Sequence, residues 1–319
     1  MKTKNKFKSA CLYTSAAAIS ISLINKLIFL SSDKDILPKN CLSYHWRFGT
    51  VSYSKCGKGT PLLLIHDLLP GDSAAEWKNV VRRFSASHTV YTLDLLGFGR
   101  SDKPAMTYTN YLYVQLIVDF VRDVIGKKTD VIATGTSANT AVLSCCSDKN
   151  LFRRLILVNP DSAEKAGQIP DRRTKLGKFI VETPVIGTLL YNIMVSKVIL
   201  RKEMSHCYYE NPAYYNRELH HAFHESAHLG GYSAKYIYSS IIGNYTNFSI
   251  SHKIGEIENK FCILGGSKEI SIQETIGHFK KLNPEVQSFC IAGSRHFPQI
   301  EKPETFFRLC EAFLADNII

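Results

Sequence analysis

The stretch that most constrains the fold runs from Val131 to Leu143. A β-branched run, Val131-Ile-Ala-Thr, leads into Gly135-Thr-Ser-Ala-Asn139, and an apolar run of helical character follows. A strand, a sharp turn and a helix in this order form the turn that lifts a serine nucleophile out of the backbone in G-x-S-x-G motifs. Here the first glycine is present and the last is Asn139, so other parts of the chain must support this interpretation.

Short apolar runs alternate with helical patterns on both sides of this stretch. Runs typical of strands are found at Pro61–Ile65, Thr89–Asp94, Leu155–Val158, Phe261–Leu264 and Val286–Ile291, after a hairpin expected from Leu42 to Cys56. Helical patterns are found at Ala74–Phe84, Asn110–Ile125, Ile272–Leu282 and Pro303–Ala315. Strands that alternate with helices across short connections predict an α/β fold with a mostly parallel central sheet flanked by helices.

The alternation stops between residues 162 and 247, where the pattern is helical and rich in Tyr and His. We therefore expect three parts. Residues 1–40 form an N-terminal apolar helix and linker, residues 41–161 and 248–319 form the α/β core, and residues 162–247 form a helical lid inserted into it.

The N-terminus has the pattern of a membrane anchor. Four lysines in residues 2–8 precede an apolar run over residues 10–30, which is long enough to cross a bilayer. No clean small-residue cleavage site ends the run, so we predict an uncleaved anchor and a membrane-associated protein. The alternative is a helix packed on the domain itself.

The side of the membrane stays open, because two features point in opposite directions. The N-terminal lysines favour a cytoplasmic N-terminus and a domain outside the cytoplasm. The nine cysteines include no C-x-x-C pair and follow no regular spacing, which is typical of a reducing compartment.

The formal net charge of +11 allows several partners. No basic run is interleaved with aromatic residues in the manner of a nucleic-acid module, so no nucleic acid is expected as a partner. We attribute the charge to an anionic membrane surface or to solubility.

Four sequence blocks resemble the α/β-hydrolase family, in its lidded branch, over residues 42–316. They are Leu62-Leu-Leu-Ile-His66, the Asp94-Leu-Leu-Gly-Phe-Gly-Arg-Ser-Asp-Lys-Pro104 block, the turn around Ser137, and Ala292-Gly-Ser-Arg-His-Phe-Pro298. They occur in the order that the family has. The resemblance implies a serine hydrolase with a catalytic triad that acts, without a cofactor or metal, on a small apolar ester-like substrate.

The resemblance also implies roles for particular residues. Ser137 would be the nucleophile, His296 its base and Glu269 the acid that orients the imidazole, with Asp161 as the alternative acid. The oxyanion of the tetrahedral intermediate would be stabilised by the backbone amides of Ala138 and Leu68.

Two departures from the family pattern motivate a non-catalytic alternative, a binding protein on the same fold. Asp67 stands where the family usually has Gly after the histidine, and Asn139 replaces the second glycine of the turn. A carboxylate aimed into the oxyanion hole would oppose the charge that develops during acyl transfer, so we expect the Asp67 side chain to point away.

A second enzyme hypothesis comes from an H-E-x-x-H string, His224-Glu225-Ser-Ala-His228. On a helix both histidines would share one face and could bind zinc, with Glu225 as the base of a peptidase. The third histidine of the longer metalloprotease pattern is absent, because Ala234 stands at that position. We expect these residues to line the lid or lie on its surface.

Overall fold

The computed structural model describes residues 2–315 and the side chains of residues 13–315. Its centre is an eight-stranded sheet with the strand order β1-β2-β4-β3-β5-β6-β7-β8. The strands are β1 (Leu42–Trp46), β2 (Gly49–Cys56), β3 (Thr60–Ile65), β4 (His88–Leu93), β5 (Thr129–Thr134), β6 (Phe152–Val158), β7 (Lys260–Gly266) and β8 (Gln287–Ile291). Strands β1 and β2 pair antiparallel and β2 joins β4 antiparallel, whereas all pairings from β4 to β8 are parallel. The prediction of a mostly parallel sheet is confirmed.

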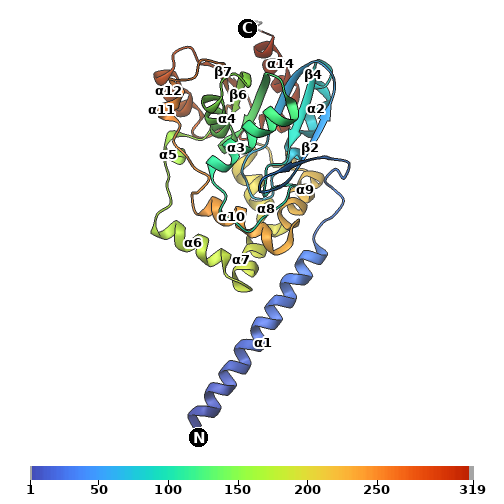
Figure 1. Cartoon of the computed structure of the whole chain (residues 1–319), viewed down its shortest axis with the longest axis vertical. Coiled ribbons are helices and arrows are strands. Elements are labelled where there is room, and N and C mark those ends of the chain that lie inside the picture. The colour runs from blue at the N-terminus through green and yellow to red at the C-terminus, as the bar shows by residue number, and fades with distance from the viewer. Residues whose placement is uncertain (1, 316–319) are drawn as a thin grey trace.

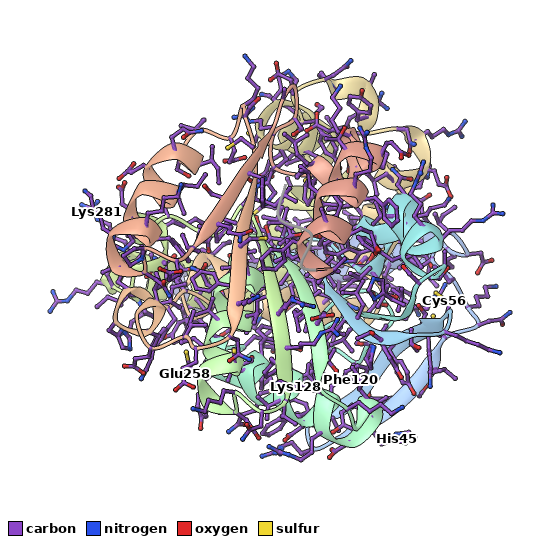
Figure 2. All side chains as sticks on the ribbon, turned by 90° about the horizontal axis from the view of Figure 1, so that it is seen from above. His45, Cys56, Phe120, Lys128, Glu258 and Lys281 are labelled. Atoms are coloured by element: carbon purple, nitrogen blue, oxygen red, sulfur yellow. The ribbon has the colours of Figure 1, made fainter. Side chains whose placement is uncertain are left out.

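Helices cover both faces of the sheet (Figure 1, Figure 2). Successive strand residues point to opposite faces, so Leu62 and Leu64 pack with α2 and α14, whereas Leu63 and Ile65 pack with α3, α4 and α12. The helices are α2 (Lys78–Phe84), α3 (Asn110–Phe120), α4 (Gly135–Ser147), α12 (Ile272–Leu282), α13 (Pro298–Glu301) and α14 (Pro303–Leu314), with short turns of helix at η1 (Ala74–Trp77) and η2 (Val121–Ile125). Each wholly buried aliphatic side chain contributes about 1.5–3 kcal/mol, which explains why the central strands are apolar throughout.

Between β6 and β7 the described chain contains helices and no strand, as expected. These are α5 (Ala163–Ala166), α6 (Arg172–Glu182), α7 (Ile186–Met194), α8 (Lys197–Glu203), η3 (Met204–Tyr208), η4 (Pro212–Tyr214), α9 (Arg217–His228), η5 (Gly231–Ala234), α10 (Lys235–Ile242) and α11 (Ser251–Ile254). We call residues 162–247 the helical insertion. Its role as a lid stays a prediction.

The N-terminal helix α1 (Lys2–Ser31) projects away from the domain (Figure 1). Its stretch Tyr13–Ser31 is long and apolar enough to cross a membrane, and only 6% of that stretch is buried. A buried contact lies at Asn25, which donates a hydrogen bond to the Val185 carbonyl (2.9 Å) and accepts one from Asn192 (3.0 Å). Most of this helix stands clear of the domain (Figure 1), and its C-terminal part contacts the domain through Asn25 and Phe29. Its role as a membrane anchor stays a prediction.

The loop after β4 is held by Asp94. Its carboxylate accepts the backbone amides of Ala74 and Arg100 at 2.8 and 2.9 Å, so the residue anchors the loop. Gly97 and Gly99 adopt positive φ angles of 94° and 46°, which L-residues rarely adopt.

Candidate active site

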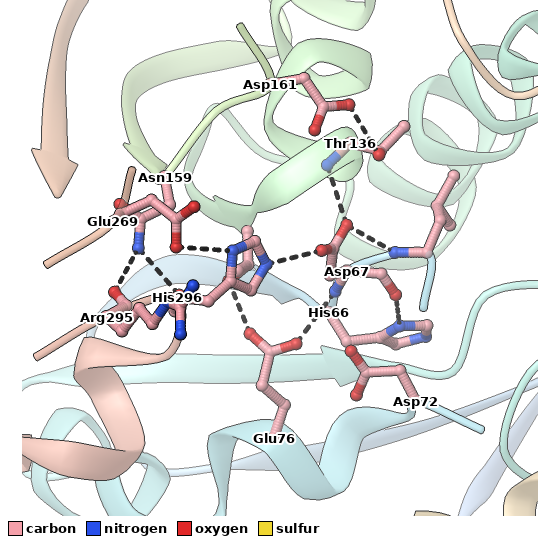
Figure 3. A network of polar contacts seen from close by, with 12 residues as sticks. His66, Asp67, Asp72, Glu76, Thr136, Asn159, Asp161, Glu269, Arg295 and His296 are labelled. Carbon is pink, nitrogen blue, oxygen red and sulfur yellow. Dashed lines mark hydrogen bonds and ion pairs between the residues drawn. The ribbon is translucent and has the colours of Figure 1, made fainter. Parts of the chain in front are cut away.

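Five loops bring polar side chains to the carboxyl edge of the parallel strands, where α/β sheets usually bind their ligands (Figure 3). They are Asp67 after β3, Thr136 after β5, Asp161 after β6, Glu269 after β7 and His296 after β8. The β-strand order therefore gathers residues that are far apart in the sequence.

The sharp turn after β5 falls at Gly135 and not at Ser137. Strand β5 ends at Thr134 and α4 begins at Gly135, whose φ of +56° marks the turn. Ser137 lies two residues further on, inside α4, with its side chain wholly buried. Its hydroxyl has no hydrogen-bond partner among the described residues. Among the described residues, no hydrogen bond joins Ser137 to His296, so the structure does not bring these two predicted residues together. The nucleophilic role of Ser137 stays a prediction.

Asp67 points into the site, contrary to expectation. Its Oδ1 accepts the backbone amides of Leu68 (2.7 Å) and Thr136 (2.8 Å), and its Oδ2 lies 2.8 Å from Nε2 of His296. Of the two amides expected as oxyanion donors, that of Leu68 donates to Asp67, and the second amide on the same oxygen is that of Thr136. The role of the Ala138 amide stays a prediction.

His296 is held between two carboxylates. Asp67 contacts Nε2, and Glu269 lies 3.5 Å from Nδ1 on the other side. Burial opposes the charged imidazole, but the hydrogen bond to Asp67 and the nearby charge of Glu269 outweigh it and raise the pKa of His296 to about 9. Burial likewise opposes the charged form of Asp67, and the contact with His296 reverses this and lowers the pKa of that carboxyl. At neutral pH the site therefore contains an imidazolium between two carboxylates.

This ion pair predicts a pH-dependent stability. The pKa of His296 is raised to about 9, above the ordinary value of about 6.5 expected for the unfolded chain. The stabilisation is therefore complete below about pH 6.5 and is lost as the pH rises through 9. We expect it to be on the order of 3 kcal/mol, measured by urea unfolding between pH 6 and 10. His296→Gln should lose this dependence; an identical pH profile in the variant would contradict it.

The two predicted acids have different surroundings. Glu269 lies beside His296, and this contact lowers its pKa although burial acts in the opposite direction. Asp161 accepts a hydrogen bond from the Thr136 hydroxyl (2.7 Å) and pairs with Lys165 (2.6 Å). The geometry therefore favours Glu269 over Asp161 as the acid that orients His296.

Neighbouring residues fix the loop that carries His296. Asn159 has a positive backbone φ of 43°. Its side-chain amide nitrogen Nδ2 donates to the backbone carbonyls of Arg295 (2.9 Å) and His296 (2.8 Å). From the helical insertion, the Tyr208 carbonyl accepts the His296 amide, and the two rings meet edge to face at 5.2 Å. Asn159 and Tyr208 are thus positioning residues for the imidazole.

The site is closed in this structure. Asp67 is wholly buried and His296 is 6% exposed. A cavity of about 550 Å³ lies beside the site, lined by the linker around Leu37, by β2 and α2 and by parts of the helical insertion. Its lining also includes Glu76, whose carboxylate accepts the Asp67 amide.

The H-E-x-x-H string has a structural role. The Glu225 carboxylate accepts the backbone amides of Asp35, Ile36 and Leu37 at 2.8–3.2 Å and pairs with Arg100 (3.0 Å). It therefore fixes the linker after α1 to the domain and is not free to act as a base. Nδ1 of His224 faces the Asp33 carboxylate at 2.9 Å. Among the described residues, no group of three or more His, Cys, Asp or Glu residues could hold a metal.

Sequence reasoning missed Gly135, and it misjudged the direction of Asp67. The sequence did contain one signal for a turn at Gly135. The small residues Ala133 and Ser137 lie two positions before and after it, and this pattern also fits a tight turn between a strand and a helix. The buried Glu76, which accepts the Asp67 amide (2.9 Å) and whose pKa burial raises to about 7, had no signal in a motif.

This protein has a mostly parallel sheet with helices on both faces and a histidine beside two carboxylates at the carboxyl edge of the sheet. These features place it among the α/β enzyme folds. Residues 62–309 match the profile of the alpha/beta hydrolase family, and the chain belongs to that family.

Curated relatives match over parts of their length. The chain is 35% identical over 71 residues to a 2-hydroxy-6-oxo-6-(2'-aminophenyl)hexa-2,4-dienoic acid hydrolase of Metapseudomonas resinovorans, covering 22% of this chain and 24% of that protein. It is 30% identical over 104 residues to a 2-hydroxymuconate semialdehyde hydrolase of a Pseudomonas species, covering 32% and 37%. The matched part therefore spans about a quarter to two-fifths of these relatives.

Solved structures match over most of the chain. The epoxide hydrolase CorEH has a TM-score of 0.71 at 20% identity, covering 87% of this chain and 99% of that one. A membrane phospholipase A has a TM-score of 0.68 at 17% identity and covers 99% of both chains. At these identities the likeness shows the shared fold alone.

Proposed function

We propose that this chain is a cofactor-independent hydrolase of a small apolar substrate, with Asp67, His296 and Glu269 as its working groups. The observation that carries the proposal is the imidazole of His296, bonded on Nε2 to Asp67 and facing Glu269 across Nδ1. Membership of the alpha/beta hydrolase family supports hydrolysis as the reaction class. An orienting acid on Nδ1 leaves the other nitrogen to exchange protons with a reacting group.

The experiment compares the full-length wild type with His296→Gln on p-nitrophenyl acetate, styrene oxide and 1-bromobutane. The proposal expects hydrolysis of one of these probes by the wild type and a loss of about 10²–10⁴-fold in the variant, which is typical of a removed acid–base residue. Turnover of none of the probes by the wild type would instead support the non-catalytic alternative, a binding protein on the same fold.

The serine route is the second candidate, in which Ser137 attacks an ester-like substrate through a Ser-His-acid triad. Its support is the position of Ser137 in the family-like turn block. Against it stand the buried hydroxyl inside α4 and the bond that Nε2 of His296 makes to Asp67. Moreover, Asp67 occupies the two backbone amides that an acyl oxyanion would need.

We also propose that the protein is anchored in a membrane by α1 and that one face of the helical insertion rests on the same bilayer. α6 and α7 lie at the end of the domain from which α1 projects (Figure 1). On α6, Leu176, Phe179 and Ile180 are exposed, and Ile186 on α7 is 60% exposed. The exposed basic residues of α6 are Arg172, Arg173 and Lys175. Apolar and basic side chains together on one exposed helix fit an anionic bilayer surface.

One deletion and one double substitution test this placement. Removal of residues 1–31 should release the protein from carbonate-washed membranes. The released domain should still co-sediment with phosphatidylglycerol vesicles, and Leu176→Ser with Phe179→Ser should weaken this binding at least several-fold. Leu282→Ser, which changes an exposed leucine at the end of α12, is the matched control. Equal vesicle binding by all three forms would remove the membrane-facing role of α6.

A further inference from the structure

Asp67 occupies the place that a side chain at the nucleophile turn would fill. A Cβ added at Gly135 would lie 2.1 Å from Oδ2 and 2.3 Å from Cγ of Asp67. The residue at this turn carries the nucleophile in hydrolases with a G-x-S-x-G turn. Here that residue has no side chain, and the carboxylate comes from the end of the neighbouring strand β3.

The surroundings of Asp67 are those of a reacting group. Its Oδ1 accepts the amides of Leu68 and Thr136, one from each loop, and Oδ2 faces Nε2 of His296. Two converging backbone amides are the usual donors to a tetrahedral oxyanion. In this site they are aimed at an oxygen of the Asp67 carboxylate itself, so they would stabilise an oxyanion formed on Cγ of Asp67.

We propose that Asp67 is a covalent nucleophile displaced from the turn to the end of β3, and that Gly135 supplies the space it needs. The substrate class is a small apolar molecule with an electrophilic sp³ carbon bearing an oxygen leaving group, such as a strained cyclic ether. A carboxylate that attacks such a carbon forms a stable ester, whereas attack on an acyl carbon would form a more reactive anhydride. This inference rests on the proposed hydrolase function and assigns the role of Asp67 within it.

The first step forms the ester. Oδ2 of Asp67 attacks the sp³ carbon as the carbon–oxygen bond of the substrate breaks. The leaving oxygen keeps the electron pair and takes the proton from Nε2 of His296. The alkylated Asp67 has lost its charge, so only Glu269 still favours the imidazolium. His296 therefore becomes a base only after the ester has formed.

The second step hydrolyses the ester. Nε2 of His296 takes a proton from a water molecule whose oxygen attacks Cγ of Asp67, and the oxyanion on Oδ1 is held by the amides of Leu68 and Thr136. Collapse of the tetrahedral intermediate breaks the bond between Cγ and the former Oδ2. That oxygen leaves as an alcohol group of the product and takes the proton of the new hydroxyl. Asp67 regains its charge beside a protonated His296, with one carboxylate oxygen derived from water.

The test uses the full chain and styrene oxide. In a single turnover in H₂¹⁸O, the peptide that contains Asp67 should gain one ¹⁸O and the diol should carry ¹⁶O. His296→Gln should accumulate one styrene oxide adduct on that peptide. Asp72→Asn is the control, because it removes a neighbouring buried carboxylate, which accepts the Ser73 amide (2.8 Å). The adduct should still form in the double variant Asp72→Asn with His296→Gln.

The outcomes separate this role from the proposed function. Hydrolysis by the wild type with ¹⁸O in the diol alone would overturn the nucleophilic role of Asp67 and leave the hydrolase function standing. Absence of both hydrolysis and adduct would overturn both. An adduct that persists after Asp67→Asn would place the nucleophile on another residue and would also overturn the proposal.

Discussion

Asp67→Asn is expected to lower kcat by about 10⁴–10⁶-fold, the range between loss of an orienting acid and loss of a nucleophile. The amide is a far weaker nucleophile than the carboxylate. The change also removes the stronger of the two partners that keep His296 protonated, because the contact of His296 with Asp67 is 2.8 Å and that with Glu269 is 3.5 Å. Turnover of styrene oxide is the measurement, with thermal unfolding as the check that the variant is folded.

Two further variants make this prediction specific. Asp72→Asn should retain turnover, because Asp72 is buried nearby but makes its hydrogen bond to the Ser73 amide. Glu269→Gln should cost less than Asp67→Asn, since it alters only the orientation and charge of the imidazole. Retention of more than about a tenth of the wild-type kcat by Asp67→Asn would contradict the role we assign to the carboxylate.

Gly135→Ala is expected to destabilise the fold by about 3–5 kcal/mol, the scale of breaking a buried ion pair. The added Cβ would lie 2.1 Å from Oδ2 of Asp67, so the carboxylate must leave its place between the two amides and His296. The φ of +56° at this position adds a cost of about 1–2 kcal/mol for any L-residue. Urea unfolding at pH 7 measures the change.

The matched control is Gly277→Ala in α12, where nothing lies within 4 Å of an added Cβ. A helical glycine in open space should gain up to about 1 kcal/mol on this change. A Gly135→Ala variant as stable as the wild type would mean that Asp67 can leave the turn without cost. That result would remove the physical reason for linking the two residues.

The strands could be predicted because the chemistry that decides them is local. Runs such as Pro61–Ile65 are apolar throughout, as a strand buried on both faces requires. The place of Glu269 at the carboxyl edge could be predicted from the family resemblance, which puts the acid in the loop after the penultimate strand. The anchoring role of Asp94 was also accessible, since its loop is rich in glycine and needs fixed turns.

The position of the turn after β5 could not be predicted from the motif. The turn motif can be aligned with Ser137 at the turn, as Gly135-Thr-Ser, or with Gly135 at the turn, as Ala133-Thr-Gly. The choice depends on where β5 ends, which is decided by its hydrogen bonding to β3 and β6. A match to G-x-S therefore moved the expected nucleophile two residues into α4. The direction of the Asp67 side chain depends on the space left by Gly135, which begins α4 and lies far from Asp67 in the sequence.

The H-E-x-x-H string illustrates a related difficulty. The spacing in α9 is right for two histidines on one face, but the backbone amides that donate to the Glu225 carboxylate come from the linker after α1. No local pattern reports such a contact between distant segments.

Fluorophosphonate labelling tests the central claim, that the nucleophile position is Gly135 and that Asp67 fills it. The double variant Asp67→Gly with Gly135→Ser restores a serine at the turn and empties the site of the carboxylate. We expect no labelling of the wild type, labelling of the double variant, and its loss when His296→Gln is added. Labelling of the wild type that disappears in Ser137→Ala would contradict the claim and return Ser137 to the role of nucleophile.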